Sequence, residues 1–285
     1  MMVEAELTGM LPPGFAGKRA PTIVYGAPPV PECSRRHRVP ILDARPLQAG
    51  AASEADFFAD HGFALLPHQT AVSDWNGDIH SIYVGEIDAI IRQRLLPGKR
   101  LEVKQWPSVI QRGSGRRFYA QFIHTDGPLS AELFAKNLAA FGAPQIEQRW
   151  LDAYAHPAVA GLVSIGFWRT INMRQPLRHM PLAMCDPSSI ERRDIFPADM
   201  VGVAPDRRPT HHAALRFNPG QKWYHYPEVT GSEVIAFKLC QFMKDEPDGL
   251  PQNVFHSAFD DPTTPADAEE RQSCEHRATV LIFRD

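Results

Sequence analysis

The sequence predicts a mainly β fold, in which a β-barrel or double-sheet jelly roll is flanked by helices. Three observations predict this class. Short apolar runs typical of strands recur along most of the chain, segments with helical periodicity concentrate in its first half, and 26 of the 285 residues are prolines. Proline breaks helices and favours loops and short strands. At 44% hydrophobic residues, the chain can bury a full core as one domain.

The first 50 residues carry the weakest pattern. From Leu11 to about Pro46 the chain is rich in proline, including Pro12-Pro13 and Pro28-Pro29-Val30-Pro31. We therefore expect residues 1–50 to form an arm wrapped over the body. Residues 51–285 contain no internal repeat and no convincing linker, so we expect them to form a single domain.

Four segments predict helices. The first, 53–61, starts at the capping residue Ser53 with Glu54 in its first turn. The second, 78–96, repeats apolar residues about every 3.6 positions and stops at Pro97-Gly98. The other two are 130–141 and 145–155. Strands are predicted at 62–67, 101–111, 117–123, 161–171, 182–185, 212–217, 234–237, 252–259 and 276–283.

Composition excludes several classes of function. The formal net charge of -3 gives no electrostatic footprint for nucleic acid. No apolar run approaches the length of a membrane span. The four cysteines lie far apart without a CxxC pair, which favours reduced thiols in a cytoplasmic protein. We find no GxSxG, Walker A, GxGxxG or HExxH motif and no zinc-type cysteine spacing.

The tripeptide His124-Thr125-Asp126 follows the β-like run 117–123 and precedes the turn-forming Gly127-Pro128. A histidine and a carboxylate two residues apart at a strand end can bind one face of a metal ion. With one distal histidine they make a 2-His-1-carboxylate triad, which leaves three positions of an octahedral Fe(II) open. The alternative is a surface histidine, with Asp126 capping the helix at 130–141.

His256 is the first candidate for the distal ligand. It lies between apolar residues in a predicted strand, where an unpartnered imidazole would be costly. His211 and His212 compete for this role, and a core histidine bonded to the backbone is the alternative.

Arg277, about twenty residues after His256, opens an apolar strand where its guanidinium needs an anionic partner. A guanidinium fork can hold the carboxylate of a co-substrate. Arg271 is the alternative anchor. A structural salt bridge is the competing interpretation of Arg277, to Asp260, Asp261 or Glu275.

Several longer segments resemble one known family. They are Gly62-Phe63-Ala64-Leu65, Ile123-His124-Thr125-Asp126, Phe167-Trp168-Arg169-Thr170-Ile171, Pro181-Leu182-Ala183-Met184-Cys185-Asp186, Trp223-Tyr224-His225-Tyr226-Pro227-Glu228, Phe237-Lys238 and the tail from His256 to Arg277. The most specific run is Ala258-Phe259-Asp260-Asp261-Pro262-Thr263. Together they resemble the hydroxylase/desaturase family that includes gibberellin-desaturase-like proteins, AsaB-type fungal tailoring enzymes and the smaller protein of the cephamycin 7-methoxylation system.

The resemblance implies a double-stranded β-helix, that is, a cupin-like jelly roll, and an Fe(II)/2-oxoglutarate dioxygenase. It implies His124, Asp126 and His256 as iron ligands and Arg277 as the 2-oxoglutarate anchor. The implied reaction uses O₂ to hydroxylate or desaturate a small substrate of secondary metabolism, with release of succinate and CO₂. Two other hypotheses are a non-catalytic partner of another tailoring enzyme on the same fold, and a metal-bound hydrolase or isomerase on a cupin-like barrel.

Candidates for substrate contact are Trp168 and Arg169, on the predicted strand 161–171. Alternation along a strand places them on opposite faces, and we expect Arg169 to point inward, where it could meet a carboxylate. A pair between Arg169 and Asp186 is the alternative. Three further pocket candidates are Tyr119, Tyr226 and Lys238.

Overall fold

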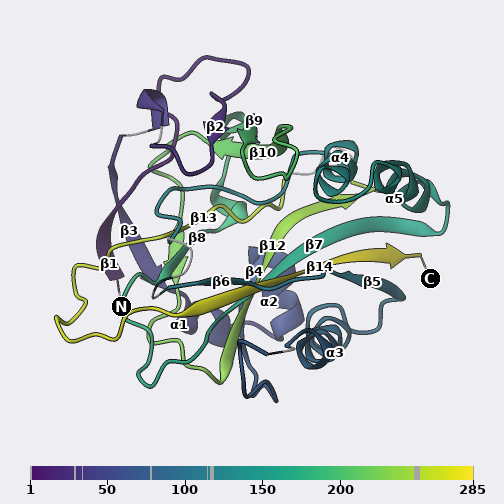
Figure 1. Ribbon diagram of the computed structural model, residues 1–285. Helices are drawn as coiled ribbons and strands as arrows, with labels where there is room; N and C mark the ends of the chain where they lie inside the picture. The colour runs from purple at the N-terminus through teal and green to yellow at the C-terminus, as the bar shows by residue number, and fades with distance from the viewer. Residues whose placement is uncertain are drawn as a thin grey trace.

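The computed structural model describes residues 2–28, 30–33, 35–77, 79–113, 115, 119–246 and 251–284. Its largest sheet has the strand order β4-β12-β7-β14-β5, with β6 paired to β14 (Figure 1). These strands are β4 (Phe63–Pro67), β5 (Leu101–Gln105), β6 (Ile110–Arg112), β7 (Val159–Thr170), β12 (Glu233–Met243) and β14 (Ser273–Phe283). All its pairings are antiparallel, and β7 and β14 lie side by side over most of their length.

A second sheet has the order β1-β3-β11-β8-β13, and a third, smaller sheet has the order β10-β9-β2. The strands of the second sheet are β1 (Met2–Leu7), β3 (His37–Asp43), β8 (Leu182–Cys185), β11 (Trp223–His225) and β13 (His256–Ala258). Those of the third are β2 (Ile23–Val24), β9 (Ile195–Val201) and β10 (Thr210–Leu215). The predicted mainly β fold with more than one sheet is therefore confirmed.

The helices lie around these sheets. They are α1 (Ala44–Ala49), α2 (Glu54–His61), α3 (His80–Ile90), α4 (Ala131–Phe141) and α5 (Gln145–Ala155), with a π-helical turn at Ile91–Leu95 and 3₁₀ turns at Pro31–Cys33, Pro187–Ser189 and Arg192–Asp194. Figure 1 shows α4 and α5 on one side of the long strands and α3 on the other. The apolar core includes Phe57 of α2, Tyr83 of α3 and Phe237 of β12, all buried.

The predicted helix starts follow from capping. The Ser53 side chain accepts a hydrogen bond from the backbone N–H of Asp56, and Ser130 accepts one from Leu133. Gly62 ends α2 at φ 73°, a left-handed conformation that glycine adopts without strain. The helices predicted at 53–61, 130–141 and 145–155 are confirmed within one residue at each end. The helix predicted at 78–96 begins at His80 and turns π-helical from Ile91.

The first 50 residues are more than an arm. Strands β1 and β3 pair with each other, and β3 also pairs with β11 of the body. Their buried faces alternate along Val3, Ala5 and Leu7 and along Val39 and Ile41. An alternation of apolar and polar residues with a period of two predicts a strand. It was present in both segments, but the surrounding prolines masked it. The N-terminal segment, predicted as an arm wrapped over the body, thus contributes two strands to the second sheet.

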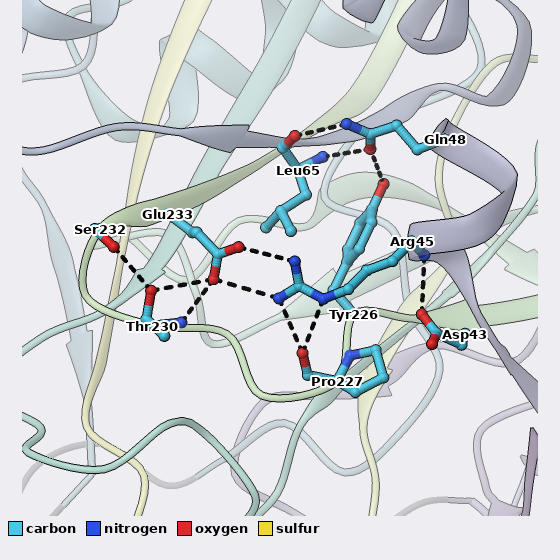
Figure 2. A network of polar contacts seen from close by, with 9 residues as sticks. All are labelled: Asp43, Arg45, Gln48, Leu65, Tyr226, Pro227, Thr230, Ser232 and Glu233. Atoms are coloured by element: carbon cyan, nitrogen blue, oxygen red, sulfur yellow. Dashed lines mark hydrogen bonds and ion pairs between the residues drawn. The ribbon is translucent and has the colours of Figure 1, made fainter. Parts of the chain in front are cut away.

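A polar network fixes α1 against the body (Figure 2). The Arg45 guanidinium lies 2.9 Å from a Glu233 carboxylate oxygen and donates to the carbonyl of Pro227. The Gln48 amide donates to the carbonyl of Leu65 and its oxygen accepts from the Leu65 N–H and from the Tyr226 hydroxyl. These bonds join the N-terminal segment to β4, to the 226–227 loop and to the start of β12.

Two predicted strands differ from the structure. Residues 117 and 118 of the predicted strand 117–123 lie outside the described residues, and 119–123 form no strand. Instead, the Ile123 N–H donates to Thr8 and the Ala120 carbonyl accepts from Ala258, so this stretch is held by single bonds to two different segments. The predicted strand 252–259 is shortened to β13.

Candidate metal centre

His124 and His256 meet in a single antiparallel β-bridge. Each backbone N–H donates to the other residue's carbonyl, at 3.1 and 2.9 Å, and the ring centroids lie 4.3 Å apart. Asp126 lies beside them, with Oδ2 3.5 Å from His256 Nε2. One ligand atom from each of the three residues falls within 4.8 Å of the others, and among the described residues no other group of three or more His, Cys, Asp or Glu does so.

The backbone fixes the orientation of both imidazoles. His124 Nδ1 lies 2.8 Å from the carbonyl of Phe122, and His256 Nδ1 lies 3.0 Å from the carbonyl of Val254. A carbonyl only accepts, so each Nδ1 donates to it, and in a neutral ring Nε2 is then the atom left to bind a metal. A hydrogen bond from the far ring nitrogen fixes the orientation of a histidine and prepares it to bind a metal.

The loop that carries Asp126 is held from behind. The Asn253 amide donates to the carbonyls of Gly127 and Pro128, and the buried Thr125 hydroxyl donates to the carbonyl of Leu239. Gly127 is required by close approach, since a Cβ there would lie 2.2 Å from the Leu239 oxygen. These contacts place the carboxylate without help from a regular strand.

The competing histidines have other partners. His211 Nδ1 lies 2.8 Å from an Asp199 oxygen. His212 Nδ1 lies 2.9 Å from the carbonyl of Thr125, and its Nε2 lies 2.9 Å from the Thr210 hydroxyl. Neither joins the cluster of His124, Asp126 and His256. His212 instead supports the loop that carries Asp126.

The protonation states suit a divalent metal. Burial lowers the pKa of His124 to about 3, and the neighbouring His256 adds to this effect. Burial alone would raise the pKa of Asp126, but Arg277, His256 and His124 outweigh it and hold this pKa well below its usual range. At neutral pH the cluster therefore offers a neutral imidazole from His124 and a carboxylate from Asp126, which are the forms that metals bind.

Arg277 lies against the cluster. Its Nη2 is 2.9 Å from Asp126 Oδ2, its Nε is 2.6 Å from Glu275 Oε1, and its guanidinium carbon lies 5.6 Å from the ring centroid of Trp106. Two carboxylates thus already pair with the residue that the sequence favoured as a co-substrate anchor. Of the structural salt bridges considered from the sequence, the one to Glu275 is present.

Arg271 has a different environment. Its side chain is buried, lies over the Tyr119 ring at 4.2 Å and near Trp168 at 5.6 Å, and donates to the carbonyl of Met180. In the part of the chain that the structure describes, its Nε has no hydrogen-bond partner, and neither has the buried hydroxyl of Ser273. Burial lowers the pKa of Arg271 to about 9. Among the described residues no carboxylate forms an ion pair with this guanidinium, so a buried positive charge remains uncompensated.

Two cavities meet at the cluster. The wide cavity, about 560 Å³, is lined by His124, Asp126 and Arg277 and by the aromatic side chains of Trp106, Phe122, Phe134 and Phe141. The narrow cavity, about 20 Å³, is lined by His124, His256, Trp168, Phe237, Arg271 and Glu275. The cluster therefore has a wide aromatic side and a narrow side that contains the uncompensated arginine.

The predicted substrate residues divide into two groups. Trp168 lines the narrow cavity, and Tyr119 supports Arg271 there. Arg169 is on the opposite face of β7, where it contacts the carbonyls of His68 and Gly231 and the rings of Trp75 and Tyr83. The prediction that Arg169 points inward is therefore wrong, because strand alternation turned Trp168 toward the cluster. Asp186, its suggested partner, pairs with His61 instead.

Tyr226 and Lys238 line neither of the two cavities at the cluster. The Tyr226 hydroxyl donates to Gln48, and the Lys238 ammonium donates to the carbonyl of Ala59 above the Phe58 ring. Burial lowers the pKa of Lys238 to about 8. Both expectations of pocket residues are corrected, since these side chains serve the packing of α1 and α2.

Sequence reasoning named Glu275 as a possible salt-bridge partner of Arg277, but it missed Trp106 and Asn253 as neighbours of the cluster. Glu275 was detectable, because it lies two positions from Arg277 on a strand and so shares its face. Trp106 and Asn253 lie outside any strand, and their approach depends on chain crossings that no local pattern encodes.

Comparisons with known proteins agree with this picture. A family model described as "Oxidoreductase/YMDC permease-like domain" matches residues 30–281. "Hydroxylase/desaturase poxK" of Penicillium oxalicum is 26% identical over 140 residues, covering 42% of each chain. "Aspirochlorine biosynthesis protein N" of Aspergillus oryzae is 27% identical over 118 residues, covering 41% of this chain and 47% of that one. The match thus spans less than half the length of either relative, and the predicted hydroxylase/desaturase resemblance is confirmed.

The fold resembles a solved structure over its whole length. Two structures described as "iron and alpha-ketoglutarate-dependent endoperoxidase NvfI" superpose with TM-scores of 0.76 and 0.69 at 20% identity, and cover 99% and 100% of this chain and 98% of the other. The predicted jelly-roll fold is confirmed. In the part of the chain that the structure describes, every helix is too short or too polar to cross a membrane.

Proposed function

Because this chain belongs to the oxidoreductase/YMDC permease-like domain family, we propose that it is an Fe(II)- and 2-oxoglutarate-dependent oxygenase acting on a small molecule. The observation that carries the proposal is the juxtaposition of the cluster with an unpaired, buried arginine. His124, Asp126 and His256 gather their ligand atoms within 4.8 Å, and Arg271 lines the same narrow cavity as the two histidines.

The donor set fits Fe(II). Two imidazoles with their Nδ1 protons held by backbone carbonyls and one carboxylate form the facial triad of non-haem iron oxygenases. We propose His124 Nε2, His256 Nε2 and one oxygen of Asp126 as the ligands. Structural zinc sites usually complete four protein ligands, and the described residues offer no fourth at this cluster.

Arg271 fits the far carboxylate of 2-oxoglutarate better than Arg277 does. Its Nε is a buried donor without a partner among the described residues, and a carboxylate in the narrow cavity would satisfy it. Arg277 already contacts two carboxylates. At about 20 Å³ the narrow cavity holds roughly one water, so admission of the diacid requires the surrounding side chains to move outward.

The roles of the protein's own residues follow from this placement. Bound iron with 2-oxoglutarate would supply the activation of O₂, with succinate and CO₂ as products. Trp168 and Tyr119 would pack against Arg271 and keep its guanidinium aimed at the diacid. Phe237, 4.8 Å from the His256 ring, would exclude water from the narrow side.

The wide cavity would hold the substrate whose C–H bond is hydroxylated or desaturated. Its volume of about 560 Å³ lies within the roughly 300–1,000 Å³ of small-molecule pockets. Its walls are mostly aromatic and aliphatic. Of its four charged members, Asp126, Glu275 and Arg277 pair with one another, and Arg112 is the fourth. We therefore propose a largely apolar molecule of secondary metabolism, as the names of the relatives also favour.

We also propose a cytoplasmic location. The four cysteines are free and buried, which suits a reducing compartment. A non-catalytic partner on the same fold has less support. Such a protein would have no physical reason to keep three ligand atoms close together beside a buried arginine without an ion-pair partner.

The proposal is tested by following 2-oxoglutarate under air. With Fe(II) and a reductant, many enzymes of this chemistry consume 2-oxoglutarate slowly without substrate, so the wild-type protein should form succinate in an O₂-dependent reaction. The Asp126→Ala variant should not form it. Binding of metal without any succinate formation, even with apolar substrate candidates added, would favour the non-catalytic alternative.

A further inference from the structure

Arg277 makes its closest contacts with a proposed metal ligand and with a neighbour on its own strand. Nη2 lies 2.9 Å from Asp126 Oδ2, and Nε lies 2.6 Å from Glu275 Oε1. The side chains of Asp126, Arg277 and Glu275 are 16%, 14% and 9% exposed. Three largely buried charges therefore form one chain of contacts, in the order Asp126–Arg277–Glu275.

The strand fixes this order. Glu275 and Arg277 are two positions apart on β14, so their side chains leave the same face of the sheet. Trp106 lies beneath the guanidinium, with its ring centroid 5.6 Å away. The arginine is thus held on its Nε side and from below, and only its Nη side points to Asp126.

This contact constrains the carboxylate. An ionised carboxylate has about four lone-pair positions on two oxygens. The bond from Nη2 occupies one of them on Oδ2 and opposes rotation of the group about its Cβ–Cγ bond. A freely rotating carboxylate could bind a metal through both oxygens and so occupy one of the positions that the triad must leave open.

Resting on the metal site proposed above, we propose that Arg277 is a positioning residue that fixes the orientation of the Asp126 carboxylate, and that Glu275 holds Arg277 in that position. Arg277 then keeps Asp126 a single-oxygen ligand and offsets one of the two negative charges beside the metal. The second carboxylate, Glu275, stays out of the coordination shell because it is bonded to Arg277 Nε.

The test combines metal binding with spectroscopy. Mn(II) binding to metal-free protein is titrated by EPR, and the ligand-field absorption of Co(II)-substituted protein reports the coordination geometry. For Arg277→Gln we expect Mn(II) still to bind, a changed Co(II) spectrum, and succinate formation reduced about 10–100-fold, the usual range for loss of a residue hydrogen-bonded to a metal ligand. The KM for 2-oxoglutarate should change less than threefold. Glu275→Gln should change the Co(II) spectrum in the same direction. Arg277→Lys should give a spectrum closer to that of the wild type than Arg277→Gln does.

Arg45→Gln is the matched control. Arg45 is partly buried and forms a 2.9 Å ion pair with Glu233 (Figure 2). Both residues are far from the cluster residues in the sequence. This variant should lower thermal stability and leave the Co(II) spectrum and the KM for 2-oxoglutarate unchanged.

The outcomes separate this inference from the proposed function. Failure of the wild-type protein to bind Mn(II) would remove the metal site itself. Wild-type binding together with an unchanged Co(II) spectrum in Arg277→Gln and Glu275→Gln would overturn only the positioning role. A KM for 2-oxoglutarate raised tenfold or more, with an unchanged spectrum, would make Arg277 the anchor instead. If Arg277→Gln does not fold, the Co(II) spectra of Arg277→Lys and Glu275→Gln test the inference instead. Spectra identical to that of the wild type in both variants would overturn it.

Discussion

The imidazoles of His124 and His256 are paired by the backbone itself, through two hydrogen bonds of 3.1 and 2.9 Å between the two residues. Residues 132 positions apart in the chain thus become direct cross-strand neighbours, with ring centroids 4.3 Å apart. Because their Nδ1 atoms are held by carbonyls two residues upstream, neither ring needs a metal to be oriented. The centre is therefore preorganised by the chain.

We predict that His124→Ala, Asp126→Ala and His256→Ala each weaken metal binding more than about 100-fold, since even the loss of a residue hydrogen-bonded to a metal ligand costs about 10–100-fold. The far-ultraviolet circular dichroism should stay close to that of the wild type. Isothermal titration with Mn(II) measures the affinity. His211→Ala is the control, because His211 pairs with Asp199 outside the cluster, and it should bind Mn(II) normally. Tight binding in His256→Ala, lost only when His211 or His212 is also replaced, would contradict the ligand assignment.

We predict that Arg271→Gln raises the 2-oxoglutarate requirement and spares the metal. Loss of a charge-assisted contact costs about 1.5–3 kcal/mol, or roughly a 10- to 150-fold weaker affinity. The KM for 2-oxoglutarate in succinate formation measures the effect, with Mn(II) affinity as the internal control. Arg271→Lys should recover only a small part of the lost 2-oxoglutarate affinity, because an ammonium lacks the planar fork of a guanidinium. A normal KM for 2-oxoglutarate in Arg271→Gln would mean that another cationic residue binds its far carboxylate.

Much of the fold and of the cluster was predictable from the sequence, because the signals were local. Capping at Ser53 marked one helix start, and the buried strands β7, β12 and β14 appeared as apolar runs. His124, Asp126 and His256 were identified from motif and spacing. The choice between Arg271 and Arg277 was not accessible, since it depends on which guanidinium meets Asp126 across the fold. The acidic neighbours Glu269 and Glu270 favour exposure of Arg271, whereas this residue is 2% exposed.

We predict that Gly127→Ala lowers both the stability of the protein and its affinity for metal, by displacing the loop that carries Asp126. Its Cβ would lie 2.2 Å from the Leu239 oxygen and 2.7 Å from the Cys240 Cβ, so the backbone beside Asp126 must shift. Overpacking of this kind typically costs about 1–3 kcal/mol, and Mn(II) affinity should fall with it. Urea unfolding and Mn(II) titration measure both effects. Gly85→Ala, in α3 with open space around the site, should be neutral or stabilising by up to about 1 kcal/mol.

We predict that metal-free protein loses stability as the pH falls from about 6.5 toward 4, in part through His276. Burial, with His80 nearby, lowers the pKa of His276 to about 4. Between this value and the usual pKa of about 6.5 the unfolded chain binds a proton that the folded protein does not, so acid favours unfolding. One such group contributes at most about 1.4 kcal/mol per pH unit. His276→Leu should flatten the slope of the unfolding free energy with pH, and an unchanged slope would contradict the assignment.

The most direct measurement of the central claim is anaerobic titration of the Fe(II)-loaded protein with 2-oxoglutarate, followed by visible absorption. If the cluster holds iron with positions open for a chelating co-substrate, a weak charge-transfer band should appear at roughly 500 nm. It should be absent from Asp126→Ala and require far more 2-oxoglutarate in Arg271→Gln. A protein that binds Fe(II) at His124, Asp126 and His256 but shows no band at saturating 2-oxoglutarate would contradict the account.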